Sequence, residues 1–234
     1  MFSILTLGFL LGLRHALEAD HVAAVASLVS KNNFKKSTLK LGAIWGLGHT
    51  IALFIFSMAF MLTDSVLPER LALGLEFVVG IMLVVLGGDV IRRLIKDKIH
   101  FHAHQHSNQQ AHFHAHKHVE GEEHDDASHE HEHQTDFSLR ALFVGLMHGM
   151  AGSAALIVLT LQTVDSVMIG MTYVLLFGIG SIVGMAALST IIAVPLRKSA
   201  KRLTHVHNGL QAIIGSTTII IGSFVITQSV GFLG

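Results

Sequence analysis

The sequence predicts an all-α polytopic membrane protein whose six transmembrane helices form an inverted 3+3 repeat. Three observations lead to this fold class: long apolar segments, a second half that repeats the first, and ionisable residues placed within apolar sequence. Of the 234 residues, 51% are hydrophobic and only 14% are charged, whereas about 25% of the residues in soluble domains are charged. The mean hydropathy of +0.58 agrees with a chain that lies largely in a bilayer.

Six apolar segments are long enough to cross a hydrocarbon core of about 30 Å, which takes about 20 helical residues. We place them at residues 2–29, 40–62, 69–92, 138–161, 166–195 and 207–232. Pro68 suits the start of the third helix, where a missing N–H group costs nothing, and Pro195 suits the end of the fifth. The first segment has no basic region before it, so we interpret it as a retained helix and not as a signal peptide.

The chain divides into a first three-helix repeat at 1–95, a histidine-rich linker at 96–136 and a second repeat at 137–234. The repeats match at nearly constant offsets of 133, 132 and 135 residues, with 12–15 matching 145–148, 45–48 matching 177–180, and 74–87 matching 209–222. Three crossings reverse the direction of the chain, so the second copy must be inverted. Inverted repeats are typical of transporters whose substrate site lies near the membrane midplane.

Positive charges predict the orientation. Lysine and arginine residues cluster in the loops after the first, third and fifth helices, whereas the opposite side has only Arg70. The positive-inside rule therefore predicts a multi-pass protein of the cytoplasmic membrane, with these three loops in the cytoplasm and both termini outside.

The first apolar segment contains an ionisable cluster, made of Arg14, His15, Glu18, Asp20 and His21. Each charged group near the bilayer centre costs about 2.5–3.5 kcal/mol on insertion scales, so such groups are retained where they pair or bind a ligand. Imidazole and carboxylate are ligands for divalent transition metals. On a regular helix Asp20 points away from the others. We therefore expect either a distorted helix or a carboxylate that fixes the tautomer of a ligating histidine.

Two further histidines extend the candidate metal site. An inverted two-fold axis would bring His148 of the fourth segment close to His15, with His49 contributed by the second segment. A structural role is an equally good interpretation of His148 taken alone. We expect Arg14 to pair with Glu18 four residues later. Glu76 could relay protons or form an ion pair.

The linker contains twelve histidines between positions 100 and 133, mixed with acidic residues. Its first eight are His100, His102, His104, His106, His112, His114, His116 and His118. This composition is typical of metal-binding tracts that need no fold. We interpret it as a cytoplasmic metal buffer or sensor; a solvated spacer and an expression tag are the alternatives.

The composition excludes several classes of function. The absence of cysteine excludes disulfides, thiolate metal sites and cysteine nucleophiles, and the distribution of basic residues gives no indication of nucleic-acid binding. No phosphate-binding Walker motif is present. No His-Glu-x-x-His motif lies in the apolar segments, so we predict that the protein is not an enzyme. An intramembrane metalloenzyme and a metal-sensing or storage protein are the alternatives from other classes.

The residues at 14–21 closely resemble the His-x4-Asp-His signature of the nickel/cobalt transporter family, and residues 47–50 resemble its second histidine motif. The six segments and residues 145–153 are similar to the short urease-accessory type of nickel permease. This resemblance implies that His15, Asp20, His21 and His49 lie on the metal path. It further implies transport of Ni²⁺ or Co²⁺ with no permanently bound cofactor, and nickel chaperones or urease and hydrogenase maturation proteins as candidate cytoplasmic partners. Uptake is favoured; related efflux proteins with histidine-rich loops are the alternative.

Overall fold

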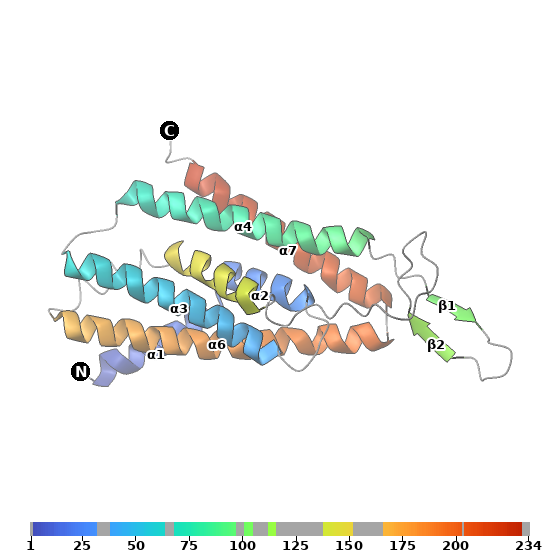
Figure 1. The fold of residues 1–234 in the computed structure, drawn as a ribbon, viewed down its shortest axis with the longest axis horizontal. Helices are drawn as coiled ribbons and strands as arrows, with labels where there is room; N and C mark the ends of the chain where they lie inside the picture. The colour runs from blue at the N-terminus through green and yellow to red at the C-terminus, as the bar shows by residue number, and fades with distance from the viewer. Residues whose placement is uncertain are drawn as a thin grey trace.

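The computed structural model describes residues 2–31, 38–63, 68–96, 101–104, 112–115, 138–151, 166–202 and 204–230. Its elements in chain order are α1 (Phe2–His15), α2 (Ala19–Lys31), α3 (Thr38–Leu62), α4 (Glu69–Lys96), β1 (Phe101–His104), β2 (His112–Ala115), a helix at residues 138–151, α6 (Val167–Arg202) and α7 (Thr204–Val230). Apart from the β1–β2 ribbon, all the described elements are helices (Figure 1).

Four of the described helices are long and apolar enough to cross a membrane, namely α3, α4, α6 and α7. They correspond to the second, third, fifth and sixth predicted segments. The fourth predicted segment, 138–161, is helical over 138–151, and the remainder of it lies outside the described residues.

The prediction of one continuous helix over 2–29 is wrong, because α1 ends at His15 and a second helix, α2, begins at Ala19. The amides of Leu17 and Glu18 donate to carbonyls three residues back, at 2.9 and 3.0 Å. Such i→i−3 bonds tighten the last turn of a helix and end it. The second half-helix, α2, then starts at Ala19 with an acidic residue in its first turn, which the positive end of the helix dipole stabilises.

The two prolines behave differently. The carbonyl of Pro68 accepts hydrogen bonds from the amides of Leu71 and Ala72 at 2.9 and 3.0 Å, directly before α4 begins. Pro195, by contrast, does not end the fifth segment, because α6 continues through it to Arg202. Membrane helices tolerate an internal proline where neighbouring groups satisfy the freed backbone groups.

Close helix contacts depend on glycine. Along α4 and α7, Gly80 lies against the backbone of Gly222, and Gly87 lies against that of Gly215. Small residues of this kind allow membrane helices to approach each other. Helix α6 contacts both α1 and α3, and α2 lies between these helices and the α4–α7 pair, as Figure 1 shows.

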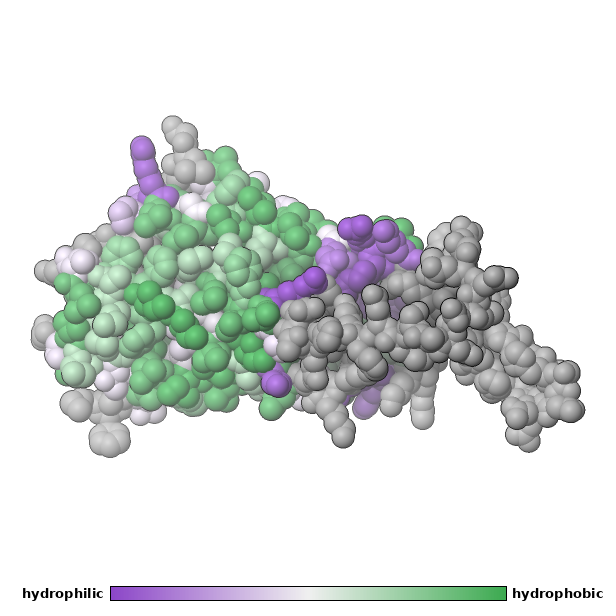
Figure 2. Space-filling view, viewed as in Figure 1, coloured by the Kyte–Doolittle hydropathy of each residue, from purple (hydrophilic) through white to green (hydrophobic). Residues whose placement is uncertain are grey.

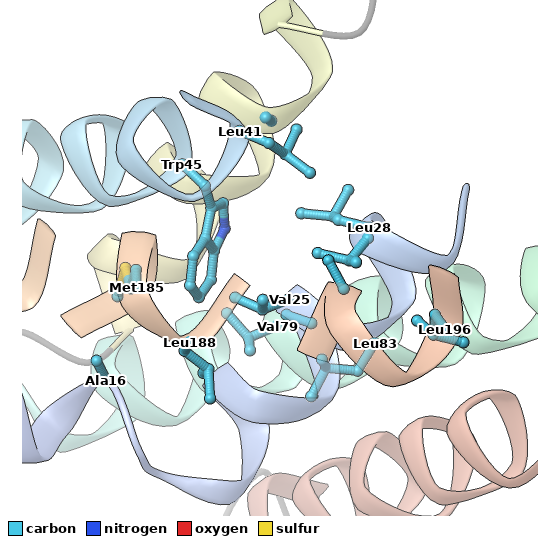
Figure 3. Close-up of a cluster of buried hydrophobic side chains, with 14 of the residues drawn as sticks. Ala16, Val25, Leu28, Leu41, Trp45, Val79, Leu83, Met185, Leu188 and Leu196 are labelled. Atoms are coloured by element: carbon cyan, nitrogen blue, oxygen red, sulfur yellow. The ribbon is translucent and has the colours of Figure 1, made fainter. Parts of the chain in front are cut away.

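The core lies where these layers meet. Trp45 is fully buried and belongs to a cluster with Val25 of α2, Leu83 of α4 and Met185 of α6. Figure 3 shows Trp45 reaching from α3 into this cluster. This cluster therefore joins the half-helix α2 to both neighbouring layers.

The outer surface is apolar. Large side chains such as Val85, Ile191 and Ile220 are about two-thirds exposed, at 64%, 66% and 67%. On the face seen in Figure 2, hydrophobic residues cover most of the described surface. Contiguous apolar surface of this extent indicates contact with lipid.

The linker was expected to need no fold, and the structure gives it a short two-stranded ribbon. Strands β1 and β2 pair antiparallel, with Phe101 opposite Ala115. In Figure 1 this ribbon lies at one end of the molecule, and both chain termini lie toward the opposite end.

Candidate functional site: a buried histidine cluster

The helix break creates the site. It places His15 at the end of α1 and puts Asp20 and His21 in the first turn of α2. His49 comes from the middle of α3, and His148 comes from the helix at 138–151. The five residues that the sequence proposed as metal ligands therefore meet at one place, although three segments far apart in the chain supply them.

Three of the four imidazoles are almost completely removed from solvent. His21, His49 and His148 are 1%, 0% and 2% exposed, and the side chain of His15 is 11% exposed. The ring centroid of His21 lies 4.3 Å from that of His15 and 4.2 Å from that of His148. This density of buried imidazole is costly unless the ring nitrogens find hydrogen-bond or metal partners.

Asp20 joins two of the rings. Its Oδ1 lies 3.0 Å from Nδ1 of His21, and its Oδ2 lies 3.0 Å from Nε2 of His148. Oδ1 also accepts a hydrogen bond from the backbone N–H of His21 at 2.9 Å. A carboxylate that accepts from three donors holds both rings in fixed orientations.

Several ring nitrogens remain without a partner. Among the described residues, Nε2 of His21, Nδ1 of His49 and Nδ1 of His148 are buried and make no hydrogen bond. Buried polar atoms are normally paired. Trp45 Nε1, Ser57 Oγ and Arg197 Nε are also buried without a partner among the described residues, but only at the histidine cluster do three unpartnered nitrogens come from neighbouring imidazoles.

Two overlapping sets of ligand atoms could each hold an ion. One is His15, His21 and His49; the other is Asp20, His21 and His148; within each set the atoms lie within 4.8 Å of one another. Metal–imidazole bonds of about 2.0–2.1 Å place adjacent ligands roughly 3.0–3.4 Å apart. The Nε2 atoms of His15 and His49 are already 3.3 Å apart, a separation that fits two ligands of one ion in the first set.

Aromatic residues form the wall of the site, and the sequence analysis did not identify them as part of it. The ring centroid of Trp45 lies 5.6 Å from that of His21 and 5.7 Å from that of His148, and that of Phe177 lies 5.1 Å from that of His15. These two aromatic residues occupy matching positions of the sequence repeat, which is the signal that could have pointed to them.

The expected pairing of Arg14 with Glu18 is wrong. Oε2 of Glu18 lies 3.0 Å from Nδ1 of His15, and Arg14 is exposed. The break in the helix explains this difference, since residues four apart face each other only on a continuous helix. Glu76 is partly buried on α4 and belongs to neither set of ligand atoms.

Four of the eight proposed linker ligands lie in the described β1–β2 ribbon, and none of these four belongs to either set of ligand atoms. His102 and His104 lie in β1, and His112 and His114 lie in β2. His100, His106, His116 and His118 lie outside the described residues.

Comparison with known proteins agrees with the motifs. The chain is 35% identical to the urease accessory protein UreH of Bacillus sp. (strain TB-90) over 222 residues, which are 95% of this chain and 90% of UreH. No protein-family model matches the chain, and no solved structure matches it.

More distant similarity extends to two proteins of Arabidopsis thaliana. The chain is 26% identical over 202 residues to chloroplast protein FOR GROWTH AND FERTILITY 1 and 24% identical over 233 residues to chloroplast protein FOR GROWTH AND FERTILITY 2. It spans about half the length of these relatives, 52% and 56%. The identity to UreH along nearly the whole of both chains shows that this chain belongs to the family of the urease accessory protein UreH.

Proposed function

We propose that the protein is a secondary transporter that moves Ni²⁺, or Co²⁺, across the cytoplasmic membrane through the buried histidine cluster. The observation that carries this proposal is the set of buried, unpartnered ring nitrogens at a helix break. Broken helices at membrane depth are typical of transporter binding sites. Nitrogen ligands suit nickel, and membership of a urease accessory family supports a nickel substrate.

The hydrogen bonds of Asp20 define which nitrogens bind the metal. An ionised carboxylate only accepts hydrogen bonds, so Nδ1 of His21 and Nε2 of His148 must carry the protons that face Asp20. The lone pairs then lie on Nε2 of His21 and Nδ1 of His148, two of the three ring nitrogens that have no partner among the described residues. Asp20 therefore acts by fixing the tautomers of two ligands and by supplying a compensating negative charge.

We further propose that the two halves form an inverted repeat, and contacts between helices support this. Gly12 lies against the backbone of Phe177, and at the matching positions Gly145 lies against the backbone of Trp45. Helix α1 of the first half thus packs on α6 of the second half, and the helix at 138–151 of the second half packs on α3 of the first.

The same correspondence holds for the glycines of the long helices α3 and α6. Gly48 lies against the backbone of Leu142, and its counterpart Gly180 lies against that of Phe9. The contact of Gly80 with Gly222 is likewise the counterpart of the contact of Gly87 with Gly215. An approximate two-fold axis explains all three pairs of contacts, and alternating access would occur by movement of one repeat against the other.

The charge distribution supports an orientation with the linker in the cytoplasm and both termini outside. An inward membrane potential supplies about 2.3 kcal/mol per charge per 100 mV, so a divalent cation gains about twice that on entry. We therefore favour uptake, driven by the potential or by a coupled ion. The chain has no cysteine, so an impermeant thiol reagent should label Glu69→Cys in intact cells and should label Lys198→Cys only after lysis.

The linker histidines would buffer metal on the cytoplasmic side, where a nickel chaperone or a urease or hydrogenase maturation protein could collect it. This role is accessory, because the transport path lies in the helices. Transport should therefore largely persist after deletion of residues 100–133.

Accumulation of radiolabelled nickel in cells, with excess cobalt or zinc as competitor, tests the proposed function. Cells that express the wild type should accumulate nickel above the empty control, and His15→Ala should abolish the difference. His205→Ala is the matched control, because His205 is an exposed histidine of α7 outside the cluster. Accumulation below the control, restored by His15→Ala, would indicate an exporter, and no dependence on His15 would refute the site.

A further inference from the structure

A second site lies apart from the histidine cluster. A cavity of about 740 Å³ opens between α2, α4 and the helix at 138–151. None of the four clustered histidines lines it. Its volume is within the range of about 300–1,000 Å³ that is usual for small-ligand sites.

One end of the cavity is cationic. Arg92 and Arg93, near the end of α4, and Arg140, near the start of the helix at 138–151, line it together with Asp89. Asp89 pairs with Arg93, since its Oδ2 lies 3.2 Å from a terminal guanidinium nitrogen and its carbonyl accepts from Nε at 3.1 Å. The lining arginines therefore exceed the lining carboxylate by two positive charges.

Much of the remaining lining is apolar. Val85, Leu139 and Phe143 line the cavity and are 64%, 63% and 62% exposed. In a membrane these side chains face the lipid. The cavity thus joins the acyl-chain region of the bilayer to a pair of guanidinium groups. The seven residues from Val85 to Arg92 correspond to roughly 10 Å of helix, which is the distance along α4 between the apolar and the cationic lining.

We propose that this cavity binds the head group of an anionic phospholipid. Arg92 and Arg140 would hold the phosphate, because the planar guanidinium donates two parallel hydrogen bonds to phosphate oxygens. Val85, Leu139 and Phe143 would contact the first part of an acyl chain. Basic pockets between helices at the cytoplasmic surface are suited to such head groups, and charge complementarity with apolar continuity favours a lipid over a soluble anion.

The position of the cavity gives the lipid a specific effect. Helix α2 contributes Ser27 and Leu28 to the lining, and the same half-helix begins with Asp20 and His21. Bound lipid would hold α2 against α4 and would thereby stabilise the folded helical bundle.

Thermal unfolding of the purified protein in micelles tests this inference. Phosphatidylglycerol should raise Tm by several degrees, whereas phosphatidylcholine should not, and Arg92→Gln with Arg140→Gln should abolish most of the shift. The control, Lys40→Gln with Lys198→Gln, removes the same charge from exposed residues that do not line the cavity, and it should keep the shift. An equal loss in the control, or an equal shift with inorganic phosphate alone, would overturn the proposal.

A second measurement leaves the arginines intact in case the double variant does not fold. The chain has no cysteine, so Leu139→Cys can carry a single fluorophore. Brominated phosphatidylglycerol should quench it at least twofold more than brominated phosphatidylcholine. Val206→Cys, at an exposed apolar position of α7 outside the cavity, should show no such preference. Equal quenching by both lipids at Leu139→Cys would refute the site.

Discussion

At the scale of single residues, Asp20 is the contact shared by two rings of the histidine cluster. Its two oxygens contact His21 and His148, and the nitrogens opposite these contacts are two of the three ring nitrogens without a partner. Sequence reasoning identified the five ionisable residues and proposed a tautomer-fixing role for this carboxylate. It offered a distorted helix as one of two possibilities but did not identify the partner of Glu18, because that contact depends on where the helix ends.

Asp20→Asn should weaken metal binding by about 10–100-fold, the usual cost of losing a partner that orients a ligand. The amide cannot accept from both rings at full strength, so one ring loses its tautomer and orientation. Trp45 is the only tryptophan of the chain and lies beside two of the rings, so its fluorescence can follow a titration with Ni²⁺ or Co²⁺. Glu69→Gln, at an exposed position of α4 that belongs to neither set of ligand atoms, is the control and should shift the midpoint much less. Equal midpoints for Asp20→Asn and the wild type would contradict this role.

At the scale of elements, the decisive feature is the division of the first apolar segment into α1 and α2. Hydropathy predicted the four long helices, because their apolar runs exceed the bilayer thickness. It predicted one helix where there are two half-helices, because the mean hydropathy over a long window changes little when only three residues form a turn. Pro195 shows the opposite error: a helix-breaking residue lies inside α6, where packing outweighs its local preference.

Gly12→Ala should destabilise the protein by about 1–3 kcal/mol, the usual cost of overpacking. The added Cβ would overlap the carbonyl oxygen of Phe177, a backbone atom that cannot move aside cheaply. Gly74→Ala is the matched control, because a Cβ there meets nothing within 4 Å and alanine favours the helix. Thermal unfolding in detergent should give a lower Tm for Gly12→Ala and an unchanged or higher Tm for Gly74→Ala. A Tm of Gly12→Ala equal to that of the wild type would contradict the close contact of α1 with α6.

On the scale of the whole molecule, the two halves of the proposed repeat contribute unequally to the cluster. The first half supplies His15, His21 and His49, and the second supplies His148. The sequence offsets proposed which positions correspond, but they could not predict that α1 packs on α6 and that the helix at 138–151 packs on α3. Because both halves contribute to one cluster, a rearrangement of the halves would change the ligand set, which is the property that alternating access requires.

Nickel flux into proteoliposomes tests the central claim most directly, because it separates a transport path from storage or sensing. The full-length protein should move Ni²⁺ to a dye trapped inside, and a version without residues 100–133 should retain most of this rate. His49→Ala should reduce the rate of either version to that of empty vesicles, whereas His205→Ala should not. Flux that survives His49→Ala, or flux that disappears only with the linker, would contradict the assignment of transport to the buried histidine cluster.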